Sequence, residues 1–186
     1  PSYINPVLLA KMITAFDQLS GGRICINLIA GQSEAENASE GIKWGKEERY
    51  EIMDEEVSIP KALWTTKGTV NFDGKFYQLK GAQIRPYPLQ QPHPRFYLGG
   101  GSKQAWEISA KHSDVHLFWG DTYERIRANM AEIKSMAARH GRVSLFPPGD
   151  KKHRAIVLLS DGEDHGSLDA ALTATLREEQ VTVFTI

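Results

Sequence analysis

The sequence predicts an α/β fold in which a parallel sheet is covered by helices. Short runs rich in β-branched residues alternate with longer amphipathic segments along most of the 186 residues, and this alternation favours right-handed βαβ units. Three apolar runs also end on glycine, at Gly31, Gly99 and Gly120. Because the carboxyl ends of parallel strands meet at one rim, where ligands of such sheets bind, we expect these three ends to share the functional side of the sheet.

The first element is predicted to be an amphipathic helix that begins at Pro6. Asn5 is a favourable cap, proline suits the first helical position, and Gly21 and Gly22 end the pattern. Apolar residues recur along it at helical spacing: Leu9, Met12, Ile13, Phe16 and Leu19. The spacing therefore predicts one apolar and one polar face.

A buried strand is predicted from Arg23 to Gly31, because this run is apolar on both faces. Cys25 fits the strand as a small core residue. Asn27 is the polar exception on the same face, and a buried amide must find a partner, which is either protein backbone or a ligand. The sequence leaves both alternatives open.

The polar stretch from Gln32 to Glu48 predicts a long loop. A helix is expected from Glu47 to Trp64, with Pro60 kinking it or ending it early. Its acidic residues indicate a solvated face rather than a metal site; they are Glu47, Glu48, Glu51, Asp54, Glu55 and Glu56. Asp73 and Gly74 then separate two alternating runs, which predicts a hairpin.

The segment RFYLGGGS, from Arg95 to Ser102, predicts a strand that meets a glycine turn and then a helix reaching about His112. Bare backbone N–H groups and the helix dipole favour an anion such as a phosphate at this kind of turn. The alternative is an ordinary tight connection between a strand and a helix, and the segment alone does not decide between the two.

A second buried strand is predicted from Asp114 to Gly120, followed by a long helix that Asp121 caps. Glu124 completes a capping box, and the apolar side of this helix is formed by Ile126, Met130, Ile133 and Ala137. His112 and His116 straddle the junction between helix and strand. They lack the shared face that a helical metal pair needs, so we interpret them as structural or exposed.

The composition excludes some classes of function. Lysine and arginine number 22 against 23 acidic residues, so neither nucleic acid nor an anionic membrane is the expected partner. A single cysteine forbids an internal disulfide and favours a reducing cytoplasm. No apolar run approaches the roughly 20 residues of a membrane span. The chain starts without methionine and stops inside an apolar run, so we expect both ends to be cut.

Several motifs in order resemble the bacterial-luciferase-like flavin monooxygenases, and most closely their alkanesulfonate branch. The motifs are FDQLSGGRICINLIAG, EERYE, FDGKFYQLKGAQIRPYPLQQPHPRFYLGGGS and LFWGD, within about residues 1–142. The resemblance implies that residues 1–146 are a partial (β/α)8 barrel of about four βα units. It also implies reduced FMN from a partner flavin reductase, a small-molecule substrate such as an alkanesulfonate, and a homo-oligomer.

The same resemblance implies site residues. Asn27 would face the flavin, Tyr50 and Ser102 would hold its phosphate, Gly100 and Gly101 would let the backbone approach, and Trp119 would line the substrate side: these form the FMN site expected here. The sequence departs from the family pattern in two places, because Lys46 stands for a usual histidine and Gly101 for a common serine. The catalytic residues are not among the positions matched, so we expect this chain alone to turn over no substrate.

Residues 147–153 are predicted to be a junction, and residues 154–186 resemble a βαβ piece of a von Willebrand factor A-type domain. By that resemblance Asp161 would help to hold a divalent metal such as Mg²⁺ through water, although the main ligands of that family are absent and a functional metal site is not favoured. The alternative function is therefore a hybrid of two fragments that acts as a non-enzymatic or metal-dependent protein-binding module.

Overall fold

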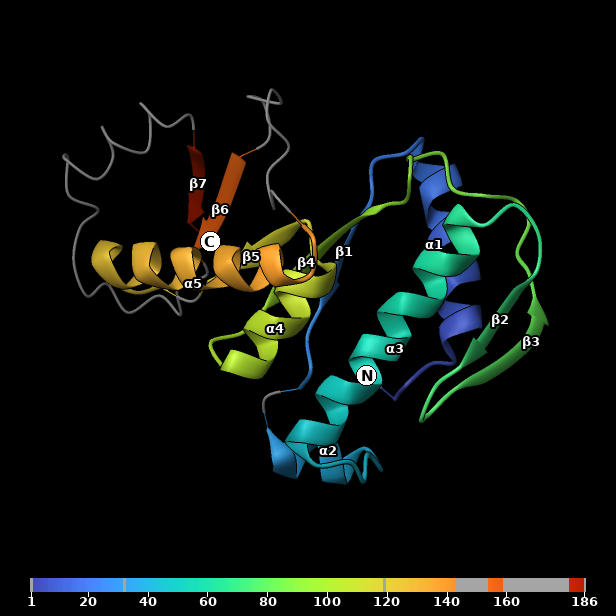
Figure 1. Cartoon of the computed structure of the whole chain (residues 1–186), viewed down its shortest axis with the longest axis horizontal. Coiled ribbons are helices and arrows are strands. Elements are labelled where there is room, and N and C mark those ends of the chain that lie inside the picture. Colours follow the sequence, from blue (N-terminus) through green and yellow to red (C-terminus); the bar gives the residue numbers. More distant parts are fainter. Residues whose placement is uncertain (1, 32, 119, 143–153, 159–180, 186) are drawn as a thin grey trace. The chain divides into compact units, whose positions relative to one another are not determined.

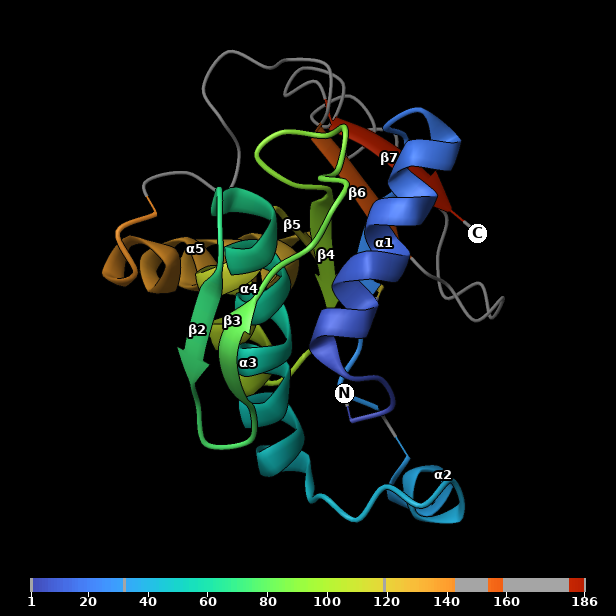
Figure 2. The same ribbon diagram turned by 90° about the vertical axis from the view of Figure 1, so that its right-hand side faces the viewer.

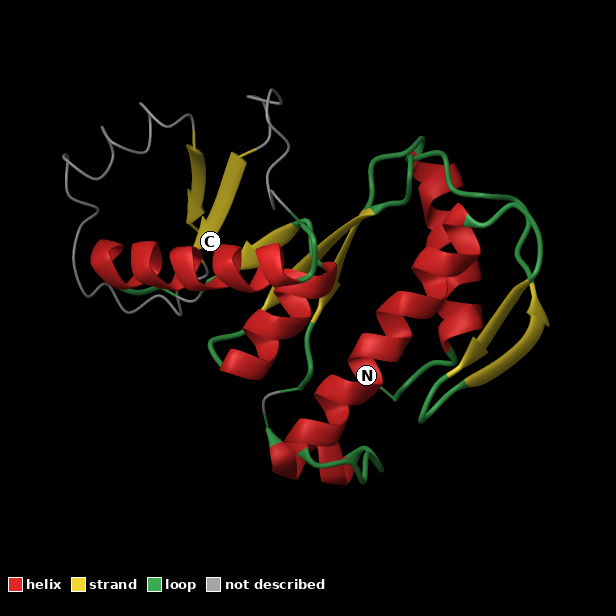
Figure 3. Cartoon of the chain, in the orientation of Figure 1, coloured by secondary structure: helices red, strands yellow, loops and turns green. Residues whose placement is uncertain are grey.

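The computed structural model of the chain describes residues 2–31, 33–118, 120–142, 154–158 and 181–185. The chain divides into two compact units, Pro1–Phe96 and Tyr97–Ile186. Both units contain helices and strands (Figures 1 and 3), and the strand pairs of the second unit are parallel. The predicted α/β class with parallel strands and helices is therefore confirmed.

The first unit is built around a pair of packed helices, α1 and α3. Its elements are α1 (Pro6–Ser20), β1 (Cys25–Leu28), α2 (Glu34–Ser39), α3 (Lys46–Thr65), β2 (Val70–Asp73) and β3 (Gln78–Ala82). The indole nitrogen of Trp64 on α3 donates to the hydroxyl of Thr14 on α1 at 2.9 Å, with both side chains buried. This bond and the aliphatic core around Ile52, Val57 and Leu63 fix the two helices against each other.

The ends of α1 lie where the sequence predicts them. Its solvent-exposed face, however, carries apolar residues that the sequence does not predict there. Asn5 accepts from the backbone N–H of Val7 at 2.9 Å, and Gly21 ends the helix with a φ of 67°. The buried positions are Pro6, Ala10, Ile13, Thr14 and Asp17, whereas Leu8, Met12, Phe16 and Leu19 are exposed. Most of the apolar stripe therefore faces away from the core of this unit.

The strand β1 is shorter and more exposed than predicted. Only Cys25–Leu28 is extended, and Ile26 is its one buried residue. Cys25 is exposed, so its interpretation as a small core residue is wrong. Asn27 is exposed as well, and the expectation of a buried amide is wrong for the same reason: in this structure the alternate face of the strand is not covered.

The helix α3 continues through Pro60 to Thr65, so the expected early end does not occur. Its acidic residues are only partly a solvated face. The carboxylate of Glu55 accepts the backbone N–H groups of the hairpin turn, from Lys75 at 2.7 Å to Tyr77 at 2.9 Å. Glu56 is buried and accepts the hydroxyl of Tyr77 at 2.9 Å. Glu51 also pairs with the Lys75 ammonium at 2.6 Å, so three of the six carboxylates contact the hairpin.

The predicted hairpin is confirmed, with a longer turn than the Asp73–Gly74 pair indicates. The strands β2 and β3 are antiparallel, and Asp73 pairs with Gln78, so four residues form the turn. Figure 2 shows the hairpin beside α3, which β2 contacts. The carboxylate of Glu55 explains the longer turn, because it satisfies N–H groups that a two-residue turn would have placed in the ladder.

The second unit contains the strand, glycine turn and helix that the sequence predicts. Its elements are β4 (Arg95–Gly99, which begins in the first unit), α4 (Lys103–His112), β5 (Val115–Leu117), α5 (Tyr123–Arg139), β6 (Arg154–Leu158) and β7 (Val181–Thr185). The strands β4 and β5 pair in parallel, with Tyr97 opposite Val115 and Gly99 opposite Leu117. The helix α4 connects them and packs against α5, which is the predicted βαβ unit.

The cap of α5 lies one residue later than predicted. Thr122, not Asp121, is the N-cap, and its hydroxyl accepts from the backbone N–H of Arg125 at 3.4 Å. Asp121 instead accepts from the N–H of Thr122 at 2.7 Å. Since both residue types are good caps, the sequence could not separate these two neighbours.

The strands β6 and β7 are parallel, with Arg154 opposite Val181 and Leu158 opposite Thr185. They form a two-stranded sheet separate from the one that contains β4 and β5. Several predictions lie outside the described residues: the junction at 147–153, Trp119 and Asp161. Among the helices described, none is both long and apolar enough to cross a bilayer.

Candidate functional site

The glycine turn after β4 is partly exposed to solvent and leads directly into α4, whose N-terminus is capped. Gly100 has a φ of 148°, in the region that favours glycine. Gly101 is exposed, and a Cβ at this position would meet no heavy atom within 4 Å. Ser102 is the N-cap of α4, and its hydroxyl oxygen accepts from the N–H of Ala105 at 3.2 Å. The turn therefore presents its backbone to open space at the positive end of a helix dipole.

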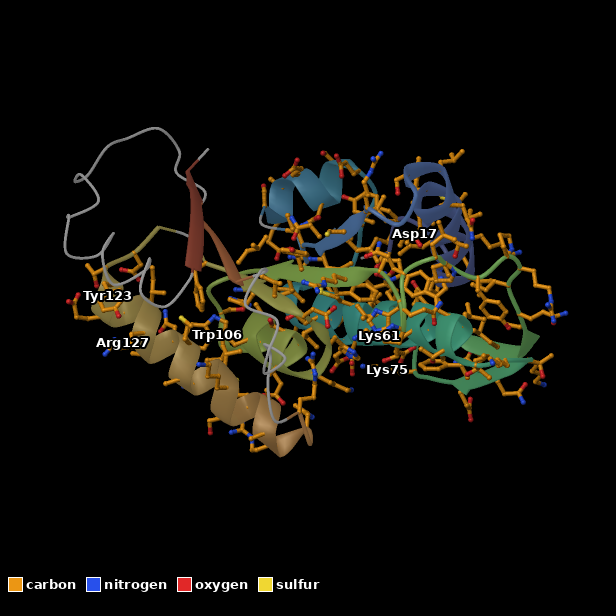
Figure 4. The ribbon with its side chains drawn as sticks, turned by 90° about the horizontal axis from the view of Figure 1, so that it is seen from above. Asp17, Lys61, Lys75, Trp106, Tyr123 and Arg127 are labelled. Carbon is orange, nitrogen blue, oxygen red and sulfur yellow. The ribbon has the colours of Figure 1, made fainter. Side chains whose placement is uncertain are left out.

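Two aromatic side chains hold the carbonyl of Gly100. The indole nitrogen of Trp106 on α4 (Figure 4) donates to it at 3.2 Å. The Nε2 atom of His116 on β5 lies 3.1 Å from the same oxygen. Because a carbonyl only accepts, His116 must carry its proton on Nε2 for this bond to form.

The imidazole of His116 is neutral at physiological pH. Burial lowers its pKa to about 4, although the bond to the Gly100 carbonyl acts in the opposite direction. Its Nδ1 atom lies 2.9 Å from the hydroxyl of Ser109, and its ring packs edge-on against Phe118 with centroids 4.6 Å apart. The glycine turn is therefore supported by an uncharged donor in a fixed orientation.

In the first unit, Tyr50 lies in α3 directly after the buried Arg49. The Arg49 side chain donates to the carbonyl of Ala30 at 2.8 Å and to that of Trp44 at 2.7 Å. Its guanidinium also forms a bidentate salt bridge with the carboxylate of Glu34, with bonds of 3.0 and 2.8 Å. This pairing raises the pKa of Arg49 and lowers that of Glu34. Arg49 thereby ties the end of β1 and the loop before α3 to the helix that carries Tyr50.

The structure places the predicted residues in two groups. Gly100, Gly101 and Ser102 are consecutive in the turn of the second unit, whereas Asn27 on β1 and Tyr50 on α3 belong to the first unit. Trp119 and Asp161 lie outside the described residues. Within the part of the chain that the structure describes, no cluster of three metal-ligating side chains occurs.

Sequence reasoning missed three residues that support these groups: Arg49, Trp106 and His116. Arg49 was part of a recognised motif, EERYE, but the motif gave no sign that its side chain would reach back to Ala30. The interpretation of His116 as structural is correct, yet its partner Gly100 lies 16 residues earlier. No local spacing in the sequence signals that pairing.

Comparison with known families gives a match over most of the chain. A family model described as luciferase-like monooxygenase matches residues 1–159. This range extends beyond the stretch of about 142 residues in which the recognised motifs lie.

Solved structures of similar fold include three enzymes. The long-chain alkane monooxygenase LadA has a TM-score of 0.69 and 23% identity, covering 77% of this chain and 38% of that chain. The riboflavin lyase RcaE, solved with modified FMN and riboflavin, has a TM-score of 0.68 and 20% identity, covering 75% and 36%. An F420-dependent secondary alcohol dehydrogenase, solved with an F420-acetone adduct, has a TM-score of 0.68 and 19% identity, covering 84% and 46%. The chain thus spans less than half the length of each, and at these identities the likeness concerns the fold.

Proposed function

Since the chain belongs to the luciferase-like monooxygenase family, we propose that it binds FMN as part of a reduced-flavin-dependent monooxygenase. The observation that carries this proposal is the family match over residues 1–159. The proposed substrate class is small organic molecules such as alkanesulfonates. A flavin reductase would supply the reduced cofactor, and reduced FMN, when bound, supplies the electrons for the reaction with O2.

The glycine turn fits the phosphate of FMN. Gly101 leaves room for an anion to approach the backbone, and the N-terminus of α4 favours negative charge. The bond from Ala105 occupies an acceptor position of the Ser102 oxygen, and a hydroxyl also carries a donor that suits a phosphate oxygen. In the proposed function Ser102 donates to the phosphate and Gly100 and Gly101 allow its close approach.

Asn27 and Tyr50 are the proposed cofactor contacts of the first unit. Asn27 is exposed on β1, so its amide is accessible to a ligand. Tyr50 follows the buried Arg49, whose bond to the Ala30 carbonyl fixes the part of α3 from which the Tyr50 side chain extends. In the proposed function the Asn27 amide faces the flavin ring, the Tyr50 hydroxyl donates to the phosphate, and Trp119 lines the substrate side. None of these contacts requires a metal.

The test is titration of the chain with oxidised and reduced FMN, followed by flavin fluorescence and absorbance. We expect saturable binding that Ser102→Ala weakens about tenfold, the effect of one lost hydrogen bond to a charged group. Ser33→Ala is the matched control, because Ser33 caps α2 with an identical bond of 3.2 Å to the N–H of Glu36. If neither redox form of FMN binds saturably at about tens of micromolar, the proposal fails.

The alternative cofactor is F420, on which the similar secondary alcohol dehydrogenase depends. A parallel titration with F420 distinguishes the two, and tighter binding of F420 than of FMN would replace the flavin in this proposal. The module of von Willebrand factor A type stays a prediction. Its test is whether Mg²⁺ raises the melting temperature, with Asp161→Asn as the variant that should remove the shift.

A further inference from the structure

The Gly100 carbonyl determines where the next backbone N–H points. The Gly100–Gly101 peptide is not among the cis bonds of the described chain, and in a planar trans peptide the carbonyl and the following N–H point in opposite directions. Trp106 and His116 both bind the carbonyl on one side. The N–H of Gly101 is therefore directed to the other side, away from both aromatic rings.

Gly101 itself is exposed, and a Cβ built on it would meet no heavy atom within 4 Å apart from its chain neighbours. The N–H of an exposed residue directly before a helix N-terminus is a good donor to an anion. The peptide of Gly100 and Gly101 has freedom to flip because both residues lack a Cβ, so something must hold its carbonyl for the donor to stay in place.

The two donors are themselves held. The indole of Trp106 is buried in α4. His116 is fixed by the Ser109 hydroxyl on Nδ1 and by Phe118 against its ring. Ser109 is in turn bonded to the hydroxyl of Ser113, and both serines are buried. With Nε2–H directed to Gly100, the Ser109 hydroxyl donates to Nδ1, and the single proton of the Ser113 hydroxyl serves either the Ser109 hydroxyl oxygen or the Ser109 carbonyl.

We infer that Trp106 and His116 are positioning residues for the cofactor phosphate. They hold the Gly100 carbonyl so that the Gly101 N–H donates to a phosphate oxygen. This inference rests on the proposed FMN function and adds to it two residues that do not touch the ligand. It makes the recognition of the phosphate, rather than of the flavin ring, depend on them.

The test compares FMN with riboflavin, which has the same ring system and no phosphate. For each variant the ratio of the riboflavin Kd to the FMN Kd is measured by fluorescence titration. We expect Trp106→Phe and His116→Leu each to reduce this ratio about tenfold, the value of one directed hydrogen bond to a charged group, with the riboflavin Kd unchanged. His116→Gln keeps a side-chain N–H donor and should restore the ratio to within about threefold of wild type.

His140→Gln is the matched control, because His140 lies in the same unit and contacts Glu107 rather than the turn. If FMN and riboflavin weaken together in the variants, the two residues are only structural and the inference is wrong. If Trp106→Phe and His116→Leu both keep the wild-type ratio, it is also wrong. A wild type that binds both ligands equally overturns the inference but leaves flavin binding intact, whereas a wild type that binds neither overturns the proposed function as well. Riboflavin binding in each variant shows that it is folded.

Discussion

The loop from Tyr87 to Gln91 and the turn from Gly99 to Ser102 are fixed through opposite ends of the peptide group. In the first loop, the buried Asp17 carboxylate of α1 (Figure 4) accepts the N–H of Leu89 at 2.6 Å and the N–H of Gln90 at 3.0 Å. It also accepts the Gln90 side chain at 2.8 Å. A charged acceptor thus occupies the donors of this loop.

In the glycine turn the roles are reversed. Uncharged donors, the indole of Trp106 and the imidazole of His116, occupy the carbonyl of Gly100. A loop whose N–H groups bind a carboxylate has none to offer an anion, and the carboxylate repels one. A turn that is held by its carbonyl keeps its N–H groups available to an anion. The side chains that hold it here, Trp106 and His116, are neutral and do not repel one. The end of the peptide group through which a loop is anchored therefore determines whether its N–H groups can bind an anion.

The largest expected effect is on the loop held by charge. Asp17→Ala removes one buried acceptor from three part-buried donors, and we expect the free energy of unfolding to fall by about 3 kcal/mol or more, because three hydrogen bonds to a charged group are lost. Urea denaturation followed by circular dichroism measures it. Lys11→Ala on the exposed side of the same helix should change stability by less than about 0.5 kcal/mol. Equal effects of the two variants would show that the carboxylate does not hold this loop.

The second effect is a pH dependence of the turn held by neutral donors. The pKa of His116 is about 4 in the folded chain against an ordinary 6.5, so the unfolded chain binds the proton more tightly. The neutral ring makes its full contribution to the free energy of unfolding above pH 6.5. This contribution falls by up to about 3 kcal/mol as the pH falls toward 4. The comparison with His116→Gln isolates the part of the pH dependence that belongs to this ring.

The measurement is the difference in unfolding free energy between wild type and His116→Gln at several pH values from 7 to 4. It should shrink steadily as the pH falls, because only the wild type has to take up a proton at this position. A constant difference would mean that His116 is not held neutral and that the contrast between the two anchors is wrong.

Local chemistry accounts for what the sequence predicted. The cap at Asn5, the helix start after Ser102 and the glycine stop at Gly21 depend on neighbours within three or four residues, and each is found where expected. The hairpin at Asp73 and Gly74 was likewise predicted from its immediate surroundings. The glycine turn of the candidate site belongs to this class, since strand, glycines and cap are consecutive.

Contacts between distant residues account for what the sequence missed. Glu55 reaches hairpin N–H groups more than 20 residues away, so a carboxylate that was predicted to be solvated holds a turn. Cys25 lies in an apolar run that alone predicts burial, but exposure depends on which elements cover the strand. His116 and Trp106 have ordinary local patterns, and only the fold brings them to one carbonyl.

The smallest expected effect is that of a substitution at Gly101, which tests whether the N–H side of the glycine turn faces a phosphate. Gly101→Ser restores the residue common in the family pattern, and its Cβ would enter open space with φ outside the left-handed region, so stability should change by less than about 0.5 kcal/mol. Its hydroxyl adds a donor beside the proposed phosphate position, and we expect the FMN Kd to fall about fivefold, a gain of about 1 kcal/mol, without a change for riboflavin. Gly101→Ala adds the same Cβ without the donor and should not tighten FMN binding. If the serine variant tightens both ligands equally, or neither, the open side of this turn does not face a phosphate, and the way its carbonyl is anchored has no bearing on the ligand.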